Sequence, residues 1–365
     1  MTLVSCSTYS FQQDIDNSKS PKSFSEKVDS IVVNKMNEYS IPGLSIGLVR
    51  NDSITYTKGY GVKSIENTDA VTENSIFHTA SISKMFTALA VVQLFESRQL
   101  SIDEKLTDIV PALDYNDIRV REVTIKQLLN HTSGLPDIGN YHWGNNKQAD
   151  SSLGEYILEY DLKLESTPGS EYRYSNLAYD ILGYVVEKVS GTSFENYVNK
   201  SVLASCGMLD SDFRYFNIQD SLRTSPHSKR WMTKSIYKRK IYPYTREHAP
   251  SSTLNSSSKD LSNWMISFLQ SLNDPQANSG LLTMTSPSFD TYPYIGLGFQ
   301  LSKIDSKRTI GHYGGDRGFR SYLVMIPEEK IGLVLLANCD YNEDFRQEIL
   351  HTIARLMLSA GNSNN

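Results

Sequence analysis

The sequence has few cysteines, few glycines and prolines, and no long apolar run. Cysteine occurs at 3 of 365 positions (6, 206 and 339), which are too few and too scattered for a disulfide framework or a zinc site. The last two stand in apolar contexts and are expected to be buried. With 21 glycines and 12 prolines the chain is neither collagenous nor of low complexity. Because its longest apolar runs, 86–95 and 331–339, fall well short of the ~20 residues that span a bilayer, we expect a globular protein without a transmembrane helix.

The chain also has no excess of basic residues. Lysine and arginine number 36 against 41 aspartates and glutamates, so the net charge is −5 and the pI about 5.9. No nucleic-acid partner is therefore expected. Residues 228–248 depart from this balance, because they interleave lysines and arginines with aromatic side chains. We expect a solvated surface there; the alternatives are an anion-binding lip and a nucleic-acid patch.

The N-terminus leaves two alternatives open. Residues 3–6, Leu-Val-Ser-Cys, are similar to the end of a bacterial lipoprotein signal, and the polar residues 7–22 suit a tether. The charged part and most of the apolar part of such a signal would have to precede Met1. The chain is then either a cell-envelope protein tethered to the membrane through lipidated Cys6, or a protein with an ordinary frayed N-terminus, cytoplasmic if Met1 is the true start.

Hydrophobic spacing predicts one sheet built from both ends of the chain. Residues 24–39 have helical spacing, and the β-rich runs 44–49 and 54–60 predict a hairpin. Further strands are predicted at 298–301, 309–312, 319–326 and 331–337, followed by a closing helix. The middle of the chain is mainly helical, with a central buried helix at 81–100 before it and helices at 124–131, 152–160, 176–190, 194–203 and 259–272.

This order predicts an α/β (α+β) fold with a central antiparallel sheet flanked by helices and an inserted, mostly helical domain. Residues 1–24 are assigned to the tether or signal remnant. The sheet domain is discontinuous, at 25–105 and 280–365, and the helical domain takes 106–279.

Ser81 and Lys84 form the most informative short motif. Their spacing of three residues at the start of the buried helix places both side chains on one face, one turn apart. A serine hydroxyl needs a base to become a nucleophile, and a desolvated lysine can have its pKa lowered enough to serve. The alternative interpretation is a helix-capping serine beside a lysine whose amine reaches solvent.

Two other patterns are interpreted as structural. Gly43-Leu44-Ser45-Ile46-Gly47 matches the nucleophile elbow of α/β-hydrolases, but a strand follows Ser45 where the elbow needs a helix. His131 invites a triad hypothesis, and we assign residues 130–134 to a helix C-cap and turn instead. The seven histidines show no metal-ligand spacing, so neither a metal nor another cofactor is expected.

Two further segments carry a family resemblance. Tyr174-Ser175-Asn176 precedes a predicted helix, and His312-Tyr313-Gly314 lies on a predicted strand. Together with Ser81 and Lys84, in this order and spacing, they resemble the three motifs of the serine β-lactamase and penicillin-binding superfamily. The branch that the chain resembles contains class C β-lactamases, D-Ala-D-Ala carboxypeptidases and related esterases, and the likeness covers about residues 25–357.

The resemblance implies an active site in the cleft between the two domains and assigns roles to its residues. Ser81 would be the acylated nucleophile, Lys84 would accept or relay its proton, and Tyr174 would be the partner in acid and base steps. Asn176 would bind the substrate amide or acyl side chain. The remaining roles concern the third motif: His312, Tyr313 and Gly314 would contact substrate, and the backbone N–H groups of Ser81 and Gly315 would form the oxyanion hole.

The third motif also departs from the family pattern, because His312 stands where β-lactamases usually carry Lys and Tyr313 where many members have Thr or Ser. A neutral imidazole attracts a carboxylate less than lysine does, and protonation near pH 6 would restore the cation. A tyrosine pointing into the cleft would exclude a bicyclic carboxylate. We therefore expect a cofactor-independent serine hydrolase that acylates on small-molecule or peptide substrates, namely esters, amides or D-amino-acid peptides. The alternatives are a class C-type β-lactamase and a catalytically silent penicillin-binding sensor module.

Overall fold

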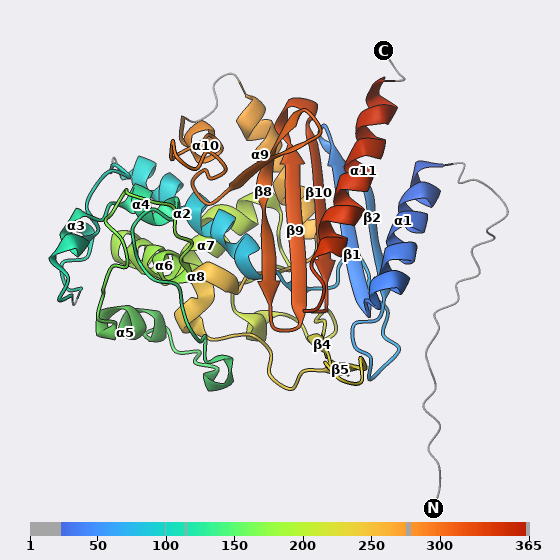
Figure 1. Cartoon of the computed structure of the whole chain (residues 1–365), viewed down its shortest axis with the longest axis horizontal. Coiled ribbons are helices and arrows are strands. Elements are labelled where there is room, and N and C mark those ends of the chain that lie inside the picture. Colours follow the sequence, from blue (N-terminus) through green and yellow to red (C-terminus); the bar gives the residue numbers. More distant parts are fainter. Residues whose placement is uncertain (1–22, 99, 114, 275–278, 363–365) are drawn as a thin grey trace, which may run out of the picture.

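A six-stranded antiparallel sheet forms the centre of the protein (Figure 1). The structure is a computed structural model that describes residues 23–98, 100–113, 115–274 and 279–362. The strand order is β2-β1-β10-β9-β8-β7. These strands are β1 (Gly43–Arg50), β2 (Ser53–Gly61), β7 (Gln300–Ile304), β8 (Lys307–Asp316), β9 (Phe319–Ile326) and β10 (Ile331–Ala337). Because β1 pairs with β10, the two ends of the chain meet in the middle of the sheet, and the predicted fold class is confirmed.

Helices cover both faces of the sheet. On one face lie α1 (Phe24–Tyr39) and α11 (Asp344–Asn362), which pack against each other and the sheet (Figure 1). On the other lies α9 (Ser258–Asn273), which contacts β1 and β10. Beyond it is the helical body, with α2 (Ser83–Ser97), α3 (Leu106–Ile109), α4 (Ile125–Leu129), α5 (Ser152–Glu159), α6 (Asn176–Ser190), α7 (Phe194–Val198), α8 (Ala249–Ser252) and α10 (Ser279–Met284).

The period-two pattern of the strands divides the core into two layers. In β10, Leu333 and Leu335 face the layer of α1 and α11, whereas Val334 and Leu336 face the layer of α2 and α9. Gly47 lets α9 approach β1 closely, because a Cβ there would lie 2.3 Å from Ser262 Oγ. The same alternation decides which side chains of β8 face the helical body.

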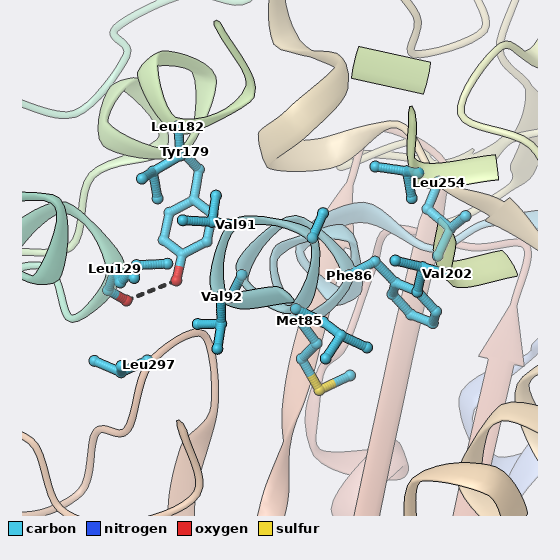
Figure 2. Close-up of a cluster of buried hydrophobic side chains, with 14 of the residues drawn as sticks. Met85, Phe86, Val91, Val92, Leu129, Tyr179, Leu182, Val202, Leu254 and Leu297 are labelled. Atoms are coloured by element: carbon cyan, nitrogen blue, oxygen red, sulfur yellow. Dashed lines mark hydrogen bonds between the residues drawn. The ribbon is translucent and has the colours of Figure 1, made fainter. Parts of the chain in front are cut away.

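Helix α2 is buried almost all round, as its composition predicts. Its side chains contact α4, α6 and the segments around Val202, Leu254 and Leu297 (Figure 2). The hydroxyl of Tyr179 on α6 donates a hydrogen bond to the carbonyl of Leu129 on α4 (2.7 Å), which satisfies a polar atom inside this apolar layer. The helix is therefore a rigid support for whatever its first turn carries.

Several sequence expectations differ from the structure in detail. Helix α9 lies within the range assigned to the helical domain but packs on the sheet, because Leu261, Met265 and their neighbours form an apolar stripe that covers β1 and β10. Cys339 is buried as expected, whereas Cys206 is only half-buried because it sits in a short surface turn. Cys6 lies outside the described residues. No helix in the described part of the chain combines the length and apolarity that a membrane span requires.

Candidate active site

Ser81 lies in a short 3-10 turn, η1 (Ala80–Ile82), that continues directly into α2. The residue before it, Ala80, has φ 50°, a left-handed conformation that costs free energy for a residue with a side chain. Ser81 is partly exposed, whereas Ala80 and Ile82 are buried. The backbone N–H of Ser81 belongs to the first turn of this continuous helix, where amides lack intrahelical acceptors.

The amine of Lys84 is surrounded by three oxygen acceptors. Its Nζ donates to Asn176 Oδ1 (2.5 Å), to the carbonyl oxygen of Ser251 (2.8 Å) and to Ser81 Oγ (3.2 Å). Three acceptors satisfy an ammonium group fully. A neutral amine keeps two of these donations and directs its lone pair at the third partner. Ser81 Oγ is the most distant of the three.

Burial lowers the pKa of Lys84 to about 7, since the side chain is fully buried. The negative charges of Asp180, Asp137 and Asp316 act in the opposite direction and raise it. Because the resulting pKa is near neutral, both the charged and the neutral amine are populated at physiological pH.

Tyr174 meets Ser81 from the loop before α6. Its hydroxyl donates to Ser81 Oγ (2.9 Å), and its ring lies 5.0 Å from Lys84 Nζ. Burial raises the pKa of this phenol far above its usual value, so it stays protonated at neutral pH. The ring packs on His131, 4.4 Å between centroids, and His131 Nδ1 accepts the N–H of Ser175 (3.1 Å). The turn predicted at residues 130–134 thus also orients Tyr174.

Asn176 is the first residue of α6, and Asp137 orients its side chain. The carboxylate Oδ1 of Asp137 accepts from both the backbone N–H and the Nδ2 of Asn176 (2.8 Å each). This leaves the Oδ1 of Asn176 turned toward Lys84 Nζ. Asp137 follows Leu135-Pro136 in a loop, and the sequence offered no signal of its role.

A substitution at Asp137 tests this arrangement. Asp137→Asn removes a negative charge that raises the pKa of Lys84, so the pKa of Lys84 should fall. We therefore expect the midpoint of the pH dependence of acylation to move below about 7. The rate should fall only a few-fold, because asparagine keeps one acceptor. Rapid-mixing kinetics against pH measure both effects. Asp161→Asn, an exposed carboxylate paired with Lys163, is the matched control and should leave the midpoint unchanged. An upward shift in Asp137→Asn would contradict this account of Lys84.

Strand β8 brings His312 to the same region, on the face that also carries Ile310. The rings of His312 and Tyr174 are 6.5 Å apart. His312 Nδ1 donates to the carbonyl of Tyr313 (2.5 Å), so Nε2 is the unprotonated nitrogen, and it has no hydrogen-bond partner among the described residues. Burial, reinforced by the positive charge of Lys84, lowers the pKa of His312 to about 3. The expectation that His312 gains charge near pH 6 is therefore wrong.

Tyr313 does not face the site. Its ring stacks on Tyr322 at 3.8 Å between centroids, and Arg346 lies 5.0 Å from it, in the layer of α1 and α11. Adjacent strand residues point to opposite faces, so with His312 on the inner face Tyr313 must be on the outer one. The expected contact of its side chain with substrate is thus corrected.

Gly314, the first glycine after Tyr313, allows β8 to approach the residues that lead into η1. A Cβ on Gly314 would lie 2.2 Å from the carbonyl oxygen of Thr79 and 2.1 Å from Ser321 Oγ. Strand β7 pairs with β8 only as far as Gly311, and the N–H of Tyr313 donates to the Gln300 side chain (3.1 Å) on that open edge. By strand alternation the N–H of Gly315 points to the same edge. Gly315 is exposed.

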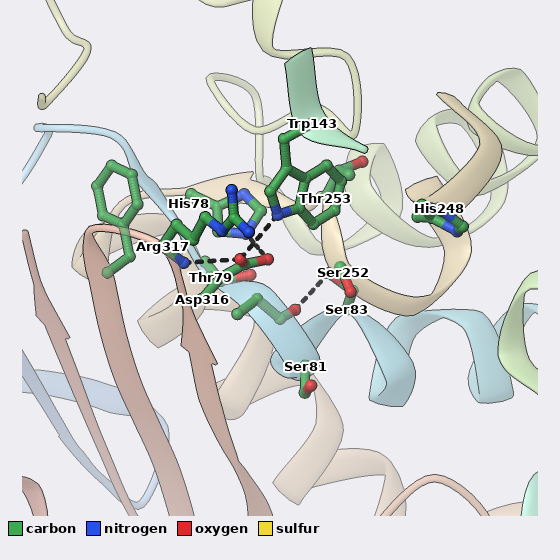
Figure 3. A network of polar contacts seen from close by, with 12 residues as sticks. His78, Thr79, Ser81, Ser83, Trp143, His248, Ser252, Thr253, Asp316 and Arg317 are labelled. Carbon is green, nitrogen blue, oxygen red and sulfur yellow. Dashed lines mark hydrogen bonds and ion pairs between the residues drawn. The ribbon is translucent and has the colours of Figure 1, made fainter. Parts of the chain in front are cut away.

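Two buried acid–histidine pairs flank the site and were not found from the sequence. Asp316 accepts from His78 Nε2 (3.2 Å), Trp143 Nε1 (3.1 Å) and the N–H of Arg317 (2.7 Å), which joins the end of β8 to a loop of the helical body (Figure 3). Asp180 contacts His248 Nδ1 (2.7 Å). Its other oxygen accepts the N–H of Ser251 (3.2 Å), whose carbonyl holds Lys84. Partners so distant in sequence produce no local pattern.

Ser45, the serine of the pattern that matches a nucleophile elbow, forms its hydrogen bonds outside this site. Ser45 is fully buried in β1, and its hydroxyl lies 2.7 Å from Ser258 Oγ on α9. Strand β1 continues past Ser45 to Arg50, in agreement with the strand predicted at 44–49. The match to the nucleophile elbow is therefore coincidental.

The mixed α/β fold and its three motifs place this chain in the superfamily of serine β-lactamases and penicillin-binding proteins, whose members are generally serine hydrolases. The chain belongs to the beta-lactamase family, which it matches over residues 28–357.

Similar proteins agree with this membership. Protein flp of Staphylococcus aureus is 27% identical over 325 residues, which are 86% of this chain and 63% of that protein. Penicillin-binding protein 4* of Bacillus subtilis is 26% identical over 326 residues, 83% of this chain and 70% of that one. The solved structure of the octameric penicillin-binding protein homologue from Pyrococcus abyssi has a TM-score of 0.78 and 26% identity, covering 91% of this chain and 77% of that one. This chain thus spans less than two thirds of the length of Protein flp.

Proposed function

We propose that the protein is a serine hydrolase that forms an acyl-enzyme on Ser81 and acts on esters, amides or D-amino-acid peptides. The observation that carries the proposal is the position of Ser81 Oγ, within 3.2 Å of Lys84 Nζ and 2.9 Å of the Tyr174 hydroxyl. Acyl transfer requires a nucleophile in contact with a base of matched pKa and with a proton donor, and Ser81 contacts one of each.

Lys84 is the proposed base for acylation. In its neutral form it donates to Asn176 and Ser251 and presents its lone pair to the Ser81 hydroxyl, from which it takes the proton as Oγ attacks the carbonyl carbon. Tyr174 cannot take this role at neutral pH, because its raised pKa keeps the phenol protonated. We assign Tyr174 to proton transfer toward the leaving group. Its phenol gives a proton to the leaving group and is reprotonated with the one that Lys84 took from Ser81, so no phenolate is left behind.

Gly315 and Ser81 are proposed to stabilise the oxyanion through their backbone N–H groups. Ser81 supplies an amide at a helix start, and Gly315 supplies one on the open edge of β8, which Gly314 holds against η1. Such fixed donors contribute most when charge develops on the substrate oxygen.

Covalent labelling tests the proposal directly. A fluorophosphonate and a fluorescent penicillin are incubated with the protein, and the modified residue is mapped by mass spectrometry. We expect the fluorophosphonate on Ser81. Modification of Ser45, or of no serine by either reagent, would contradict it.

His312 determines our proposal on substrate class. A neutral ring that presents the unprotonated Nε2 as an acceptor offers nothing to a substrate carboxylate, so neutral esters should be preferred to penicillins and cephalosporins. Because the pKa of His312 is about 3, lowering the pH to 6 should not change this preference.

The variant His312→Lys should raise kcat/KM for a chromogenic cephalosporin relative to a p-nitrophenyl ester by about tenfold, the scale of one charge-assisted hydrogen bond. Tyr313→Thr is the matched control. It should leave the ratio unchanged, because the ring lies on the outer face of the sheet. A wild-type protein that strongly prefers the cephalosporin would contradict the prediction.

The same measurements distinguish the proposed hydrolase from a β-lactamase and from a silent sensor module. A β-lactamase would turn over the cephalosporin, and a silent sensor module would be labelled by penicillin without turnover of any substrate.

We also propose that the protein is located at the cell envelope, which its similarity to penicillin-binding protein 4* supports.

A further inference from the structure

The hairpin tip, residues 229–240, carries two adjacent side chains that are almost fully exposed. It comprises the end of β4 (His227–Lys229), the turn at 230–235, β5 (Ile236–Lys238) and the two residues that follow, and it lies at the lower edge of the molecule in Figure 1. Trp231 is 84% and Met232 83% exposed. Among the described residues these are the most exposed large apolar side chains. Two neighbouring apolar residues at such a tip leave a hydrophobic surface without a partner in the chain.

The hairpin tip is also strongly basic. Its twelve residues include six lysines and arginines and no acidic residue, whereas the whole chain has a net charge of −5. Lys238 pairs with Glu66 and Arg239 with Asp340. The other four cations, at positions 229, 230, 234 and 240, have no carboxylate within 4.0 Å in the described part of the chain. The rest of the chain has more acidic than basic residues, so a negative surface would attract this edge more strongly than the remainder of the molecule.

The backbone holds the tip in one conformation. The N–H of Arg230 donates to the Ser235 carbonyl (2.9 Å), and the N–H of Lys234 donates to the Arg230 carbonyl (3.0 Å). The Thr233 and Ser235 hydroxyls are 2.8 Å apart. An ordered tip presents Trp231 without the entropy cost that a free loop would incur on binding.

We propose that the hairpin tip docks on an anionic phospholipid surface, with Trp231 and Met232 entering the interfacial region and the surrounding cations facing lipid phosphates. Tryptophan is favoured at this depth because its ring is apolar and its N–H is polar. Lysine and arginine gain electrostatic attraction from anionic headgroups. A nucleic-acid duplex presents its phosphates outside and keeps its base faces stacked within the helix, so it would leave the two apolar side chains in water.

The chain contains its own reporter. Of its three tryptophans, Trp143 is 3% and Trp264 0% exposed. A change in tryptophan emission when lipid is added therefore reports a change in the surroundings of Trp231. The full chain, with Cys6→Ser in every arm so that no acyl group contributes, is mixed with phosphatidylcholine vesicles or with vesicles that also contain phosphatidylglycerol. We expect sedimentation with the anionic vesicles, a blue shift of emission that Trp231→Phe removes, and weaker binding in high salt.

Matched variants separate the apolar and electrostatic contributions. Trp231→Ser with Met232→Ser should lower the partition coefficient at least about tenfold, and Lys234→Glu with Lys240→Glu by about tenfold or more. Leu209→Ser, at an equally exposed apolar residue, and Lys303→Glu, on β7, should have no effect. Hydrolysis of a soluble ester should be unchanged in all of them, so this test is independent of the proposed function.

Several results would overturn the proposal. These are equal binding to neutral and anionic vesicles, undiminished binding of either hairpin variant, and no binding at all. Self-association that depends on Trp231 would assign the tip to a contact between copies of the chain. Binding to an acidic protein or to DNA in place of vesicles would assign it to that partner.

Discussion

Ser81→Ala should abolish covalent labelling and lower kcat/KM by about 10⁴-fold or more, because no other hydroxyl occupies the position between Lys84 and Tyr174. The fold should survive. Lys84 keeps Asn176 and Ser251 as partners, and loss of one partly exposed hydroxyl changes the free energy of unfolding by at most about 1–2 kcal/mol. Mass spectrometry after fluorophosphonate treatment measures the labelling, and thermal unfolding checks the fold.

Ser45→Ala is the control for this experiment. It removes a buried hydroxyl that contacts Ser258, so we expect a loss of about 1 kcal/mol in stability with labelling and turnover unchanged. Retained labelling in Ser81→Ala, or its loss in Ser45→Ala, would show that the nucleophile has been assigned wrongly.

Lys84→Ala and Tyr174→Phe should each slow acylation by about 10²-fold or more, the usual contribution of a positioned base or acid. Their pH dependences should differ. Wild type and Tyr174→Phe should both gain rate as the pH rises through about 7, where Lys84 loses its proton, whereas Lys84→Ala should lack this step. Single-turnover acylation of an activated ester between pH 5 and 9 measures the rates.

The choice of substrate provides the control for these two variants. An ester with a very good leaving group needs little proton donation, so it should rescue Tyr174→Phe more than Lys84→Ala. If both variants remain within a few-fold of wild type on every substrate, the sensor-module alternative or a different base is favoured.

Local patterns in the sequence were enough to place the main elements. The strands at 319–326 and 331–337 and helix α6 at 176–190 have the predicted bounds, because their apolar spacing is regular and turn residues mark their ends. The central helix was predicted to start at Ser81, whereas α2 begins at Ser83 after η1, since a tertiary contact with β8 shapes the first turn. The hairpin β4–β5 leaves no clear strand pattern in the sequence, because each of its strands is three residues long and the two together contain few apolar side chains.

The sequence by itself determined the strands of the antiparallel sheet and the central helix, because hydrophobic spacing along one chain carries that information. It pointed to Ser81, Lys84, Tyr174 and Asn176 through their resemblance to the motifs of the superfamily. Tertiary structure alone decided their chemistry. The pKa of Lys84 depends on full burial and on carboxylates that are brought near by folding, and the neutral state of His312 depends on the same burial. The outward direction of Tyr313 followed from the face that β8 turns to the helical body. Burial, electric field and strand orientation arise only when distant segments pack together, so no local pattern could have disclosed them.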